Sequence, residues 1–155
     1  MPILIVLLFS FITAISVSFF RQRQLNYRLC GRIALAAMFI FAGVSHFILD
    51  DGMVKMLPDF IPLRYSIVYL TGLVEIAFAW GFLQSKYSRL TGILAIAFLL
   101  FVFPANIYAA INSVEFGGNV NGVKYLLFRV PLQLFLIGWI WLASVSKSKD
   151  SQYPT

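Results

Sequence analysis

Five polar side chains of this sequence lie inside or at the ends of long apolar stretches. They are His46, Glu75, Asn106, Arg129 and Gln133. A carboxylate and an imidazole can carry protons, whereas a guanidinium and two amides can hydrogen-bond to a polar head group. In a bilayer a central charged side chain costs about 2.5 to 3.5 kcal/mol even on lenient insertion scales. We therefore expect these groups to meet inside a helical bundle.

The two ionisable residues deepest in the apolar stretches, Glu75 and Arg129, have opposite charges. A guanidinium can engage a carboxylate through two parallel hydrogen bonds, so pairing them removes most of the burial cost. Gln133 follows Arg129 by four residues and shares its helical face. Gly72, Glu75 and Ala79 share a face of another helix, where small residues permit close approach of a neighbour. The sequence predicts a Glu75–Arg129 salt bridge.

Two interpretations of this polar cluster stay open. It is either a structural clasp that holds the helices together, or a site in which Glu75 and His46 are the catalytic, proton-carrying groups. In the second interpretation Arg129, Gln133 and Asn106 bind a ligand. Pro104 and Pro131 lie beside the cluster and each remove a helical hydrogen bond. Kinks at these prolines are typical both of cavities between helices and of transmembrane helices without any site.

Metal and disulfide chemistry have little support in the sequence. His46 is the only histidine and Cys30 the only cysteine. A haem or metal centre normally needs at least two strong ligands, so we expect no metal site. A glycine-rich nucleotide loop and an iron–sulfur cysteine set are also missing. No covalently held cofactor is therefore expected.

The elements that must position these residues are membrane-spanning helices. Of 155 residues, 61% are hydrophobic and 12% charged, whereas an ordinary soluble domain has about 25% charged residues. A span needs about 20 apolar residues, and five stretches qualify. The five are Pro2 to Phe20, Leu29 to Leu49, Tyr65 to Leu83, Leu90 to Ile111 and about Val123 to Ala143. The predicted fold class is all-α, an integral membrane helical bundle.

We expect three parts in the chain. Residues 1–28 form an N-terminal span with a basic connection, residues 29–143 a four-helix membrane domain, and residues 144–155 a polar tail. The first span lacks a cationic start and is longer than a signal core usually is, which favours a retained helix over a cleaved signal peptide. The connection from Asp50 to Arg64 is apolar, with Met53, Met56, Leu57 and Phe60 spaced for one helical face. It is expected to be a short interfacial lid or anchor.

The lysines and arginines are distributed unequally between the two ends of the spans. Eight flank the first and third connections and the tail, and three flank the other two connections. By the positive-inside rule the N-terminus is outside and the C-terminus inside, so the polar cluster lies in the outer half of the membrane. The net charge of +6 is a topology signal, and without a basic stripe it does not indicate nucleic acid. The eight cations are Arg21, Arg23, Arg28, Arg32, Lys86, Arg89, Lys147 and Lys149, and the three are Lys55, Arg64 and Lys124.

Several short motifs occur in the order of a known family. They are Gly43-Val-Ser-His46-Phe47, Met56-Leu-Pro58-Asp-Phe-Ile-Pro62, Gly72-Leu-Val-Glu75-Ile, Phe103-Pro104-Ala-Asn106-Ile and Arg129-Val-Pro131-Leu-Gln133. Together they resemble the DoxX-like family of four-helix membrane proteins, over about Leu29 to Leu142. The first span departs from that pattern. The shared residues of that family fall on His46, Glu75, Asn106, Arg129 and Gln133, the residues that depth in the membrane also selects.

The resemblance implies several activities. Members of the wider family are similar to a membrane subunit of a thiosulfate:quinone oxidoreductase, to a maturation subunit for methylamine dehydrogenase and to a receptor-assembly chaperone. The favoured hypothesis is a multi-pass inner-membrane protein that binds a quinone-like lipophile in an outer-half cavity, as the subunit of a redox complex with a membrane or periplasmic partner. The alternative is a non-enzymatic assembly factor or scaffold. A transporter ranks third, because five helices need a homo-oligomer to enclose a pathway. Whether the chain is an enzyme stays open.

Overall fold

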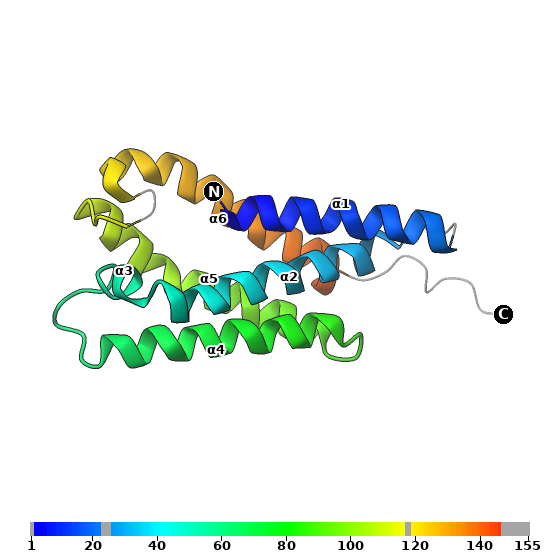
Figure 1. The fold of residues 1–155 in the computed structure, drawn as a ribbon, viewed down its shortest axis with the longest axis horizontal. Coiled ribbons are helices and arrows are strands. Elements are labelled where there is room, and N and C mark those ends of the chain that lie inside the picture. The colour runs from blue at the N-terminus through cyan, green and yellow to red at the C-terminus, as the bar shows by residue number, and fades with distance from the viewer. Residues whose placement is uncertain (1, 23–25, 117–118, 147–155) are drawn as a thin grey trace.

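In the computed structural model, which describes residues 2–22, 26–116 and 119–146, the chain forms a bundle of long helices (Figure 1). No strand occurs within those ranges. Arg23, Lys147, Lys149 and the tail beyond Ser146 lie outside the described residues, as does the side chain of Arg21. The elements are α1 (Pro2–Gln22), α2 (Tyr27–Ile48), α3 (Asp50–Val54), α4 (Arg64–Leu83), α5 (Ser88–Ile111), η1 (Asn119–Tyr125), α6 (Leu126–Ile140) and η2 (Trp141–Val145).

Five helical segments are long and apolar enough to cross a membrane. They are α1, α2, α4, α5 and the continuous run of η1, α6 and η2 from Asn119 to Val145. The all-helical class is therefore confirmed for the described residues, and five helices have the length and apolar composition that were predicted for spans. Hydropathy along the sequence predicts these helices because a span needs only sufficient length and an apolar surface, whichever helices pack against it.

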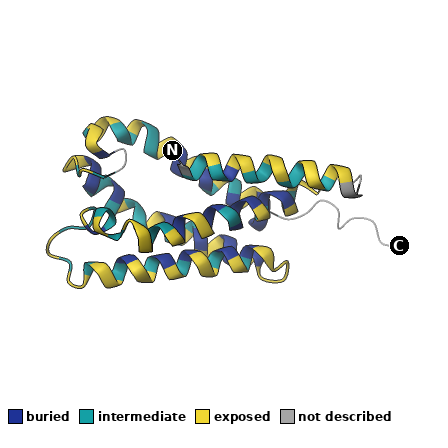
Figure 2. Ribbon diagram, in the orientation of Figure 1, coloured by how far each residue is buried: buried dark blue, intermediate teal, exposed yellow. Residues whose placement is uncertain are grey.

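Helix α2 lies at the centre of the packing, in contact with α1, α4 and α6. Its buried side is rich in small residues, and Phe39 on that side stacks on Phe82 of α4 with ring centroids 5.6 Å apart. Figure 2 shows buried residues along the inward faces of the helices and exposed residues along the outward faces. Most of those exposed side chains are large and apolar, as expected for surfaces that face lipid.

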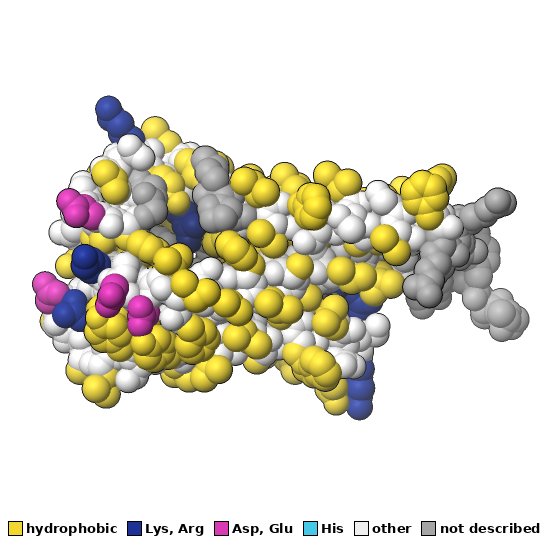
Figure 3. Space-filling view, viewed as in Figure 1, with side chains coloured by type: hydrophobic (Ala, Val, Ile, Leu, Met, Phe, Trp, Pro, Cys, Tyr) yellow, Lys and Arg dark blue, Asp and Glu magenta, His cyan; other side chains and the backbone are white. Residues whose placement is uncertain are grey.

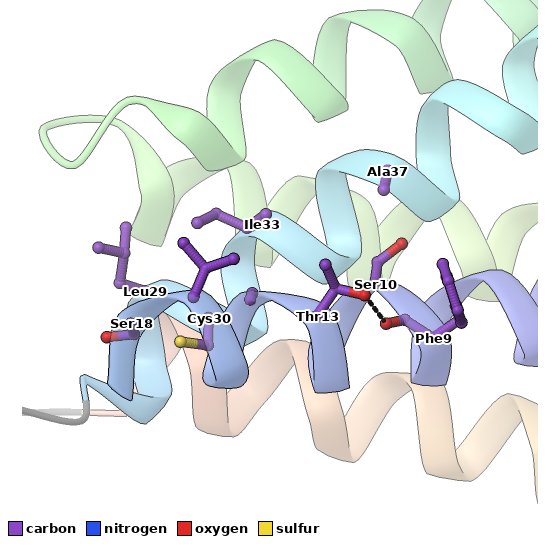
Figure 4. Close-up of a pocket in the computed structure, with 10 residues that line it drawn as sticks. Phe9, Ser10, Thr13, Ser18, Leu29, Cys30, Ile33 and Ala37 are labelled. Atoms are coloured by element: carbon purple, nitrogen blue, oxygen red, sulfur yellow. Dashed lines mark hydrogen bonds between the residues drawn. The ribbon is translucent and has the colours of Figure 1, made fainter. Parts of the chain in front are cut away.

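The first span covers the bundle from the outside. Leu7 of α1 is fully buried, and Phe11 meets Trp139 of α6 edge to face with centroids 4.7 Å apart. Further along α1 the contact with α2 opens into an apolar cavity of about 500 Å³, lined on one side by Phe9, Thr13 and Val17 and on the other by Leu29 and Ile33 (Figure 4). The Thr13 hydroxyl is used within its own helix, where it donates to the Phe9 carbonyl at 2.8 Å.

The two ends of the bundle differ in charge. One end carries α3 and η1, and we call it the α3 end; the other carries the α1–α2 and α4–α5 connections and the end of η2, and we call it the basic end (Figure 1). The acidic side chains visible in Figure 3 gather at the α3 end, and an apolar band covers the middle of the molecule. This distribution agrees with a helical bundle whose middle faces hydrocarbon.

The connection after α2 forms a shorter helix than its pattern of apolar residues suggests. Helix α3 ends at Val54, the chain then turns, and Phe60 is 84% exposed rather than part of an apolar face. Two hydrogen bonds tie α3 to α4: Tyr65 donates to Asp51 at 2.7 Å and Tyr69 to Asp50 at 2.5 Å. Helix α3 therefore fixes the end of α2 against the start of α4.

Candidate functional site

The α3 half of the bundle contains all five of the polar residues singled out by the sequence. Each comes from a spanning segment: His46 from the last turn of α2, Glu75 from the middle of α4, Asn106 from α5, and Arg129 and Gln133 from α6. Glu75, Asn106 and Gln133 are buried, while His46 and Arg129 are partly buried. The structure divides them into two groups, one between α2 and α4 and one between α5 and α6.

The first group depends on a close crossing of α2 and α4 at two glycines. A Cβ atom on Gly43 would lie 2.8 Å from the carbonyl oxygen of Gly72, and one on Gly72 would lie 2.7 Å from the Cβ of His46. Gly72, Glu75 and Ala79 are all buried, as the shared face of α4 predicts. The absence of side chains at the crossing brings His46 and Glu75 together.

Three oxygen atoms surround the ring of His46. Its Nδ1 lies 2.9 Å from the carbonyl oxygen of Val68 and 3.1 Å from the hydroxyl of Thr71, and its Nε2 lies 3.4 Å from Oε2 of Glu75. A carbonyl can only accept, so Nδ1 carries a proton. Nε2 and Oε2 of Glu75 lie within ion-pair distance, which attracts them when His46 holds a second proton. His46 and Glu75 are thus neighbouring titratable groups.

The second group joins α6 to the kinked part of α5. Arg129 Nη2 donates to Oδ1 of Asn106 at 2.9 Å, and the Asn106 amide donates to the carbonyl of Val102 at 3.2 Å. Gln133 donates to the carbonyl of Leu99 at 2.8 Å. Val102 lies two residues and Leu99 five residues before Pro104, which removes a helical hydrogen bond in this part of α5. Gln133 and Asn106 therefore have a structural task on the backbone of α5 near Pro104.

The direct salt bridge predicted between Glu75 and Arg129 is wrong. Glu75 lies against His46, and the hydrogen bond that Arg129 makes to a side chain among the described residues goes to Asn106. The reason is packing: α6 lies against α5 and α2, so Arg129 faces α5, whereas the glycine crossing directs Glu75 toward α2.

Two buried atoms of the cluster have no hydrogen-bond partner among the described residues: Oε2 of Glu75 and Nε of Arg129. The 3.4 Å separation between Glu75 and His46 satisfies the distance of an ion pair but lacks the geometry of a hydrogen bond. Buried polar atoms are nearly always paired in native proteins, so each such atom needs an explanation, such as a water or a ligand. Nε of Arg129 is a hydrogen-bond donor, and Oε2 of Glu75 belongs to a carboxyl group.

Sequence reasoning missed the neighbours of His46. The contact with Val68 is made through its backbone carbonyl, for which the sequence contains no signal. Thr71 lies four residues before Glu75, but a threonine at this spacing does not by itself indicate a site. No grouping of three or more His, Cys, Asp or Glu residues that would hold a metal ion occurs in the part of the chain that the structure describes. Cys30 is buried and free.

The comparisons with known proteins give a family for most of the chain. Residues 35–144 match the family described as Domain of unknown function (DUF8561). The chain belongs to this family. The matched region begins inside α2 and ends inside η2, so it includes all five residues of the polar cluster and leaves out α1. No curated protein and no solved structure matches the chain.

Proposed function

We propose that the protein is a multi-pass inner-membrane protein that binds the polar head of a small quinone-like lipophile at the cluster of His46, Glu75, Asn106, Arg129 and Gln133. In this proposal it acts as a subunit of a membrane redox complex. The observation that supports it is the pair of unpartnered buried atoms, Nε of Arg129 and Oε2 of Glu75. Buried polar atoms without partners suit a ligand that supplies the missing hydrogen bonds.

The chemistry of the two atoms fits a quinone and its reduced form. The Nε–H group of Arg129 would donate to a carbonyl oxygen, and the Glu75 carboxyl group would exchange a proton with a hydroxyl. A quinone supplies the transfer of electrons together with protons. The chain supplies binding through Arg129, and proton exchange through the neighbouring titratable groups of Glu75 and His46. The electron donor is a partner protein in this proposal.

His46 gives the proposed proton path its direction. It stands in the last turn of α2, two residues before the helix ends at Ile48, and 18% of its side chain is exposed. Glu75 lies deeper, with 12% of its side chain exposed. A proton released at Glu75 would therefore pass to His46 and from there to the water at the α3 end.

A structural role for the cluster is the second candidate, and a specific observation favours it. Asn106 and Gln133 both donate to carbonyls of α5 near Pro104, a task that needs no ligand. A non-enzymatic assembly factor or scaffold needs only such a stable bundle. The DoxX-like relationship suggested by the motifs is compatible with both candidates and belongs to the proposal.

Two variants separate the two candidates. If the cluster binds a head group, His46→Gln and Gln133→Leu should each reach the membrane at normal abundance and yet lose bound quinone or complementing activity. Loss of one hydrogen bond to the head group weakens binding by about 1 kcal/mol, or roughly fivefold. Abundance is measured by immunoblot, and quinone by solvent extraction of the purified protein. A loss of function that follows the loss of protein in both variants would refute the ligand site and leave the scaffold.

The proposed orientation places the N-terminus outside and the basic end in the cytoplasm. A topology reporter fused after Ser144 should then behave as cytoplasmic, and one inserted within residues 112–122 as external, because cations are retained on the cytoplasmic side. Activity of the paired reporters in intact cells is the measurement. The reverse pattern would move the polar cluster to the inner half of the membrane and contradict the proton path toward the exterior.

A further inference from the structure

A polar cavity lies at the basic end of the bundle, far along the spans from the cluster described above. It has a volume of about 180 Å³ and is bounded by the start of α2, the start of α5 and the end of the last span. Its walls include three arginines and three serines, namely Arg28, Arg32, Arg89, Ser88, Ser144 and Ser146. A water molecule takes about 30 Å³ in the liquid, so the cavity has room for a small anion with its hydration.

No carboxylate within the described residues neutralises these arginines. The acidic residues there are Asp50, Asp51, Asp59, Glu75 and Glu115. The first three belong to α3 and the connection that follows it, Glu75 to the middle of α4, and Glu115 to the connection after α5, all away from the basic end. Three like charges around one cavity repel each other, and an anion would remove that repulsion.

The hydrogen-bonding state of the cavity wall also indicates a missing partner. Arg28 is anchored, because its Nη2 donates to the carbonyl and the hydroxyl of Ser146. Within the described ranges Arg32 makes a long contact of 3.4 Å to the Ser85 hydroxyl, and its buried Nε has no partner there. Ser144 is 93% buried (7% exposed), and its hydroxyl also lacks a partner among the described residues. A hydroxyl turns about one side-chain bond, so Ser144 can donate into the cavity.

The start of α5 adds a further positive contribution. Ser88 and Arg89, the first two residues of this helix, line the cavity. The first backbone N–H groups of a helix have no partner within it, and the helix dipole places partial positive charge at this end. A helix N-terminus beside arginines is a common environment for a phosphate group. Here it coincides with the unpartnered hydroxyl of Ser144 and the unpartnered Nε of Arg32.

We propose that the cavity formed by Arg28, Arg32, Arg89 and Ser144 binds a phosphate group. Arg32 and Arg89 supply the charge, Ser144 donates a hydrogen bond, and Arg28 holds the end of the last span in place as a positioning residue. The site lies where the spans end, at the level of lipid head groups. The phosphate therefore belongs either to an anionic phospholipid or to a small phosphate-bearing solute, and the two sources offer the same chemistry to these residues.

The test uses the full-length protein in a neutral detergent, with phosphatidylglycerol and inorganic phosphate as probes and phosphatidylcholine as the uncharged reference. We expect native mass spectrometry to show retention of phosphatidylglycerol over phosphatidylcholine. Arg32→Gln and Arg89→Gln should each weaken it about tenfold, the effect of losing a hydrogen bond to a charged group. Ser144→Ala, which removes one atom and leaves the helices intact, should weaken it several-fold.

Lys86→Gln is the matched control. Lys86 has the same charge and lies at the same end, but it lies over the ring of Tyr87 and does not line the cavity. Selective retention of phosphatidylglycerol that the cavity variants lower and Lys86→Gln does not would support a lipid phosphate. Thermal stabilisation by inorganic phosphate with the same variant pattern would support a solute phosphate. Equal retention of both lipids without phosphate stabilisation, or equal losses in Lys86→Gln and the cavity variants, would overturn the site.

Discussion

The variant Arg129→Met is expected to lose about 1.5 to 3 kcal/mol of unfolding free energy, the contribution of a hydrogen bond that involves a charged group. Arg129 donates to Asn106 across the contact between α6 and α5. Methionine keeps most of the side-chain length but leaves Asn106 Oδ1 without its donor. An acceptor left without its donor inside a bundle is costly because water does not replace the missing bond. Unfolding in detergent, followed by a structural probe such as circular dichroism, measures the loss.

The control is the same substitution at an exposed ion pair. Arg64 contacts Asp59 at 2.6 Å, but Asp59 is 91% exposed, and such surface pairs contribute about 1 kcal/mol or less. Arg64→Met should therefore be nearly neutral. Because Asn106 is the hydrogen-bond partner of Arg129, adding Asn106→Leu to Arg129→Met should recover part of the loss, a coupling that a double-mutant cycle measures. Equal stability of Arg129→Met and Arg64→Met would contradict the buried network.

The second large effect is expected at the crossing of α2 and α4. In Gly43→Ala the new Cβ would lie 2.8 Å from the Gly72 carbonyl oxygen and 2.7 Å from Cγ1 of Ile76. The carbonyl belongs to the backbone and cannot rotate away, so the helices must move apart. Overpacking of this kind costs about 1 to 3 kcal/mol. The same movement separates His46 from Glu75, so activity should fall more than stability alone explains. Thermal unfolding and complementation test both expectations.

Gly138 offers a matched control within a membrane helix. A Cβ atom there would meet no neighbour within 4 Å, and Gly138 lies in α6. Gly138→Ala should be neutral or stabilising by up to about 1 kcal/mol, because alanine has the higher helix propensity. If Gly43→Ala proved as stable and as active as Gly138→Ala, the close crossing would not be what positions His46 and Glu75.

The spans and the depth of the polar residues were predictable because both depend on counting along the chain. Hydropathy marks five stretches, and the fixed rise of a helix then sets how deep Glu75 or Arg129 lies. The face shared by Gly72, Glu75 and Ala79 follows from helical periodicity and is buried as expected. These inferences need no knowledge of which helix packs against which.

The pairing of side chains inside the cluster was not predictable, because it depends on which helices pack against each other. Opposite charges favour Glu75 with Arg129, but the choice of partner depends on the neighbours of each helix, and α6 packs against α5 and α2. His46 contacts a backbone carbonyl, and the sequence of side chains does not predict such a contact. The arginines of the basic end served only as topology signals in the sequence. Their shared cavity becomes visible once the last span brings Ser144 beside them.

The most direct test of the proposed function is the lipophile content of the purified wild-type protein. The protein is extracted in a mild detergent, washed free of bulk lipid and analysed for bound quinone by chromatography and mass spectrometry. If the unpartnered atoms of Glu75 and Arg129 receive a head group, quinone should be recovered in a stoichiometric amount, and the His46→Gln protein should retain less. A wild-type protein that is consistently free of quinone and co-purifies with a single protein partner would contradict the ligand site and favour the scaffold.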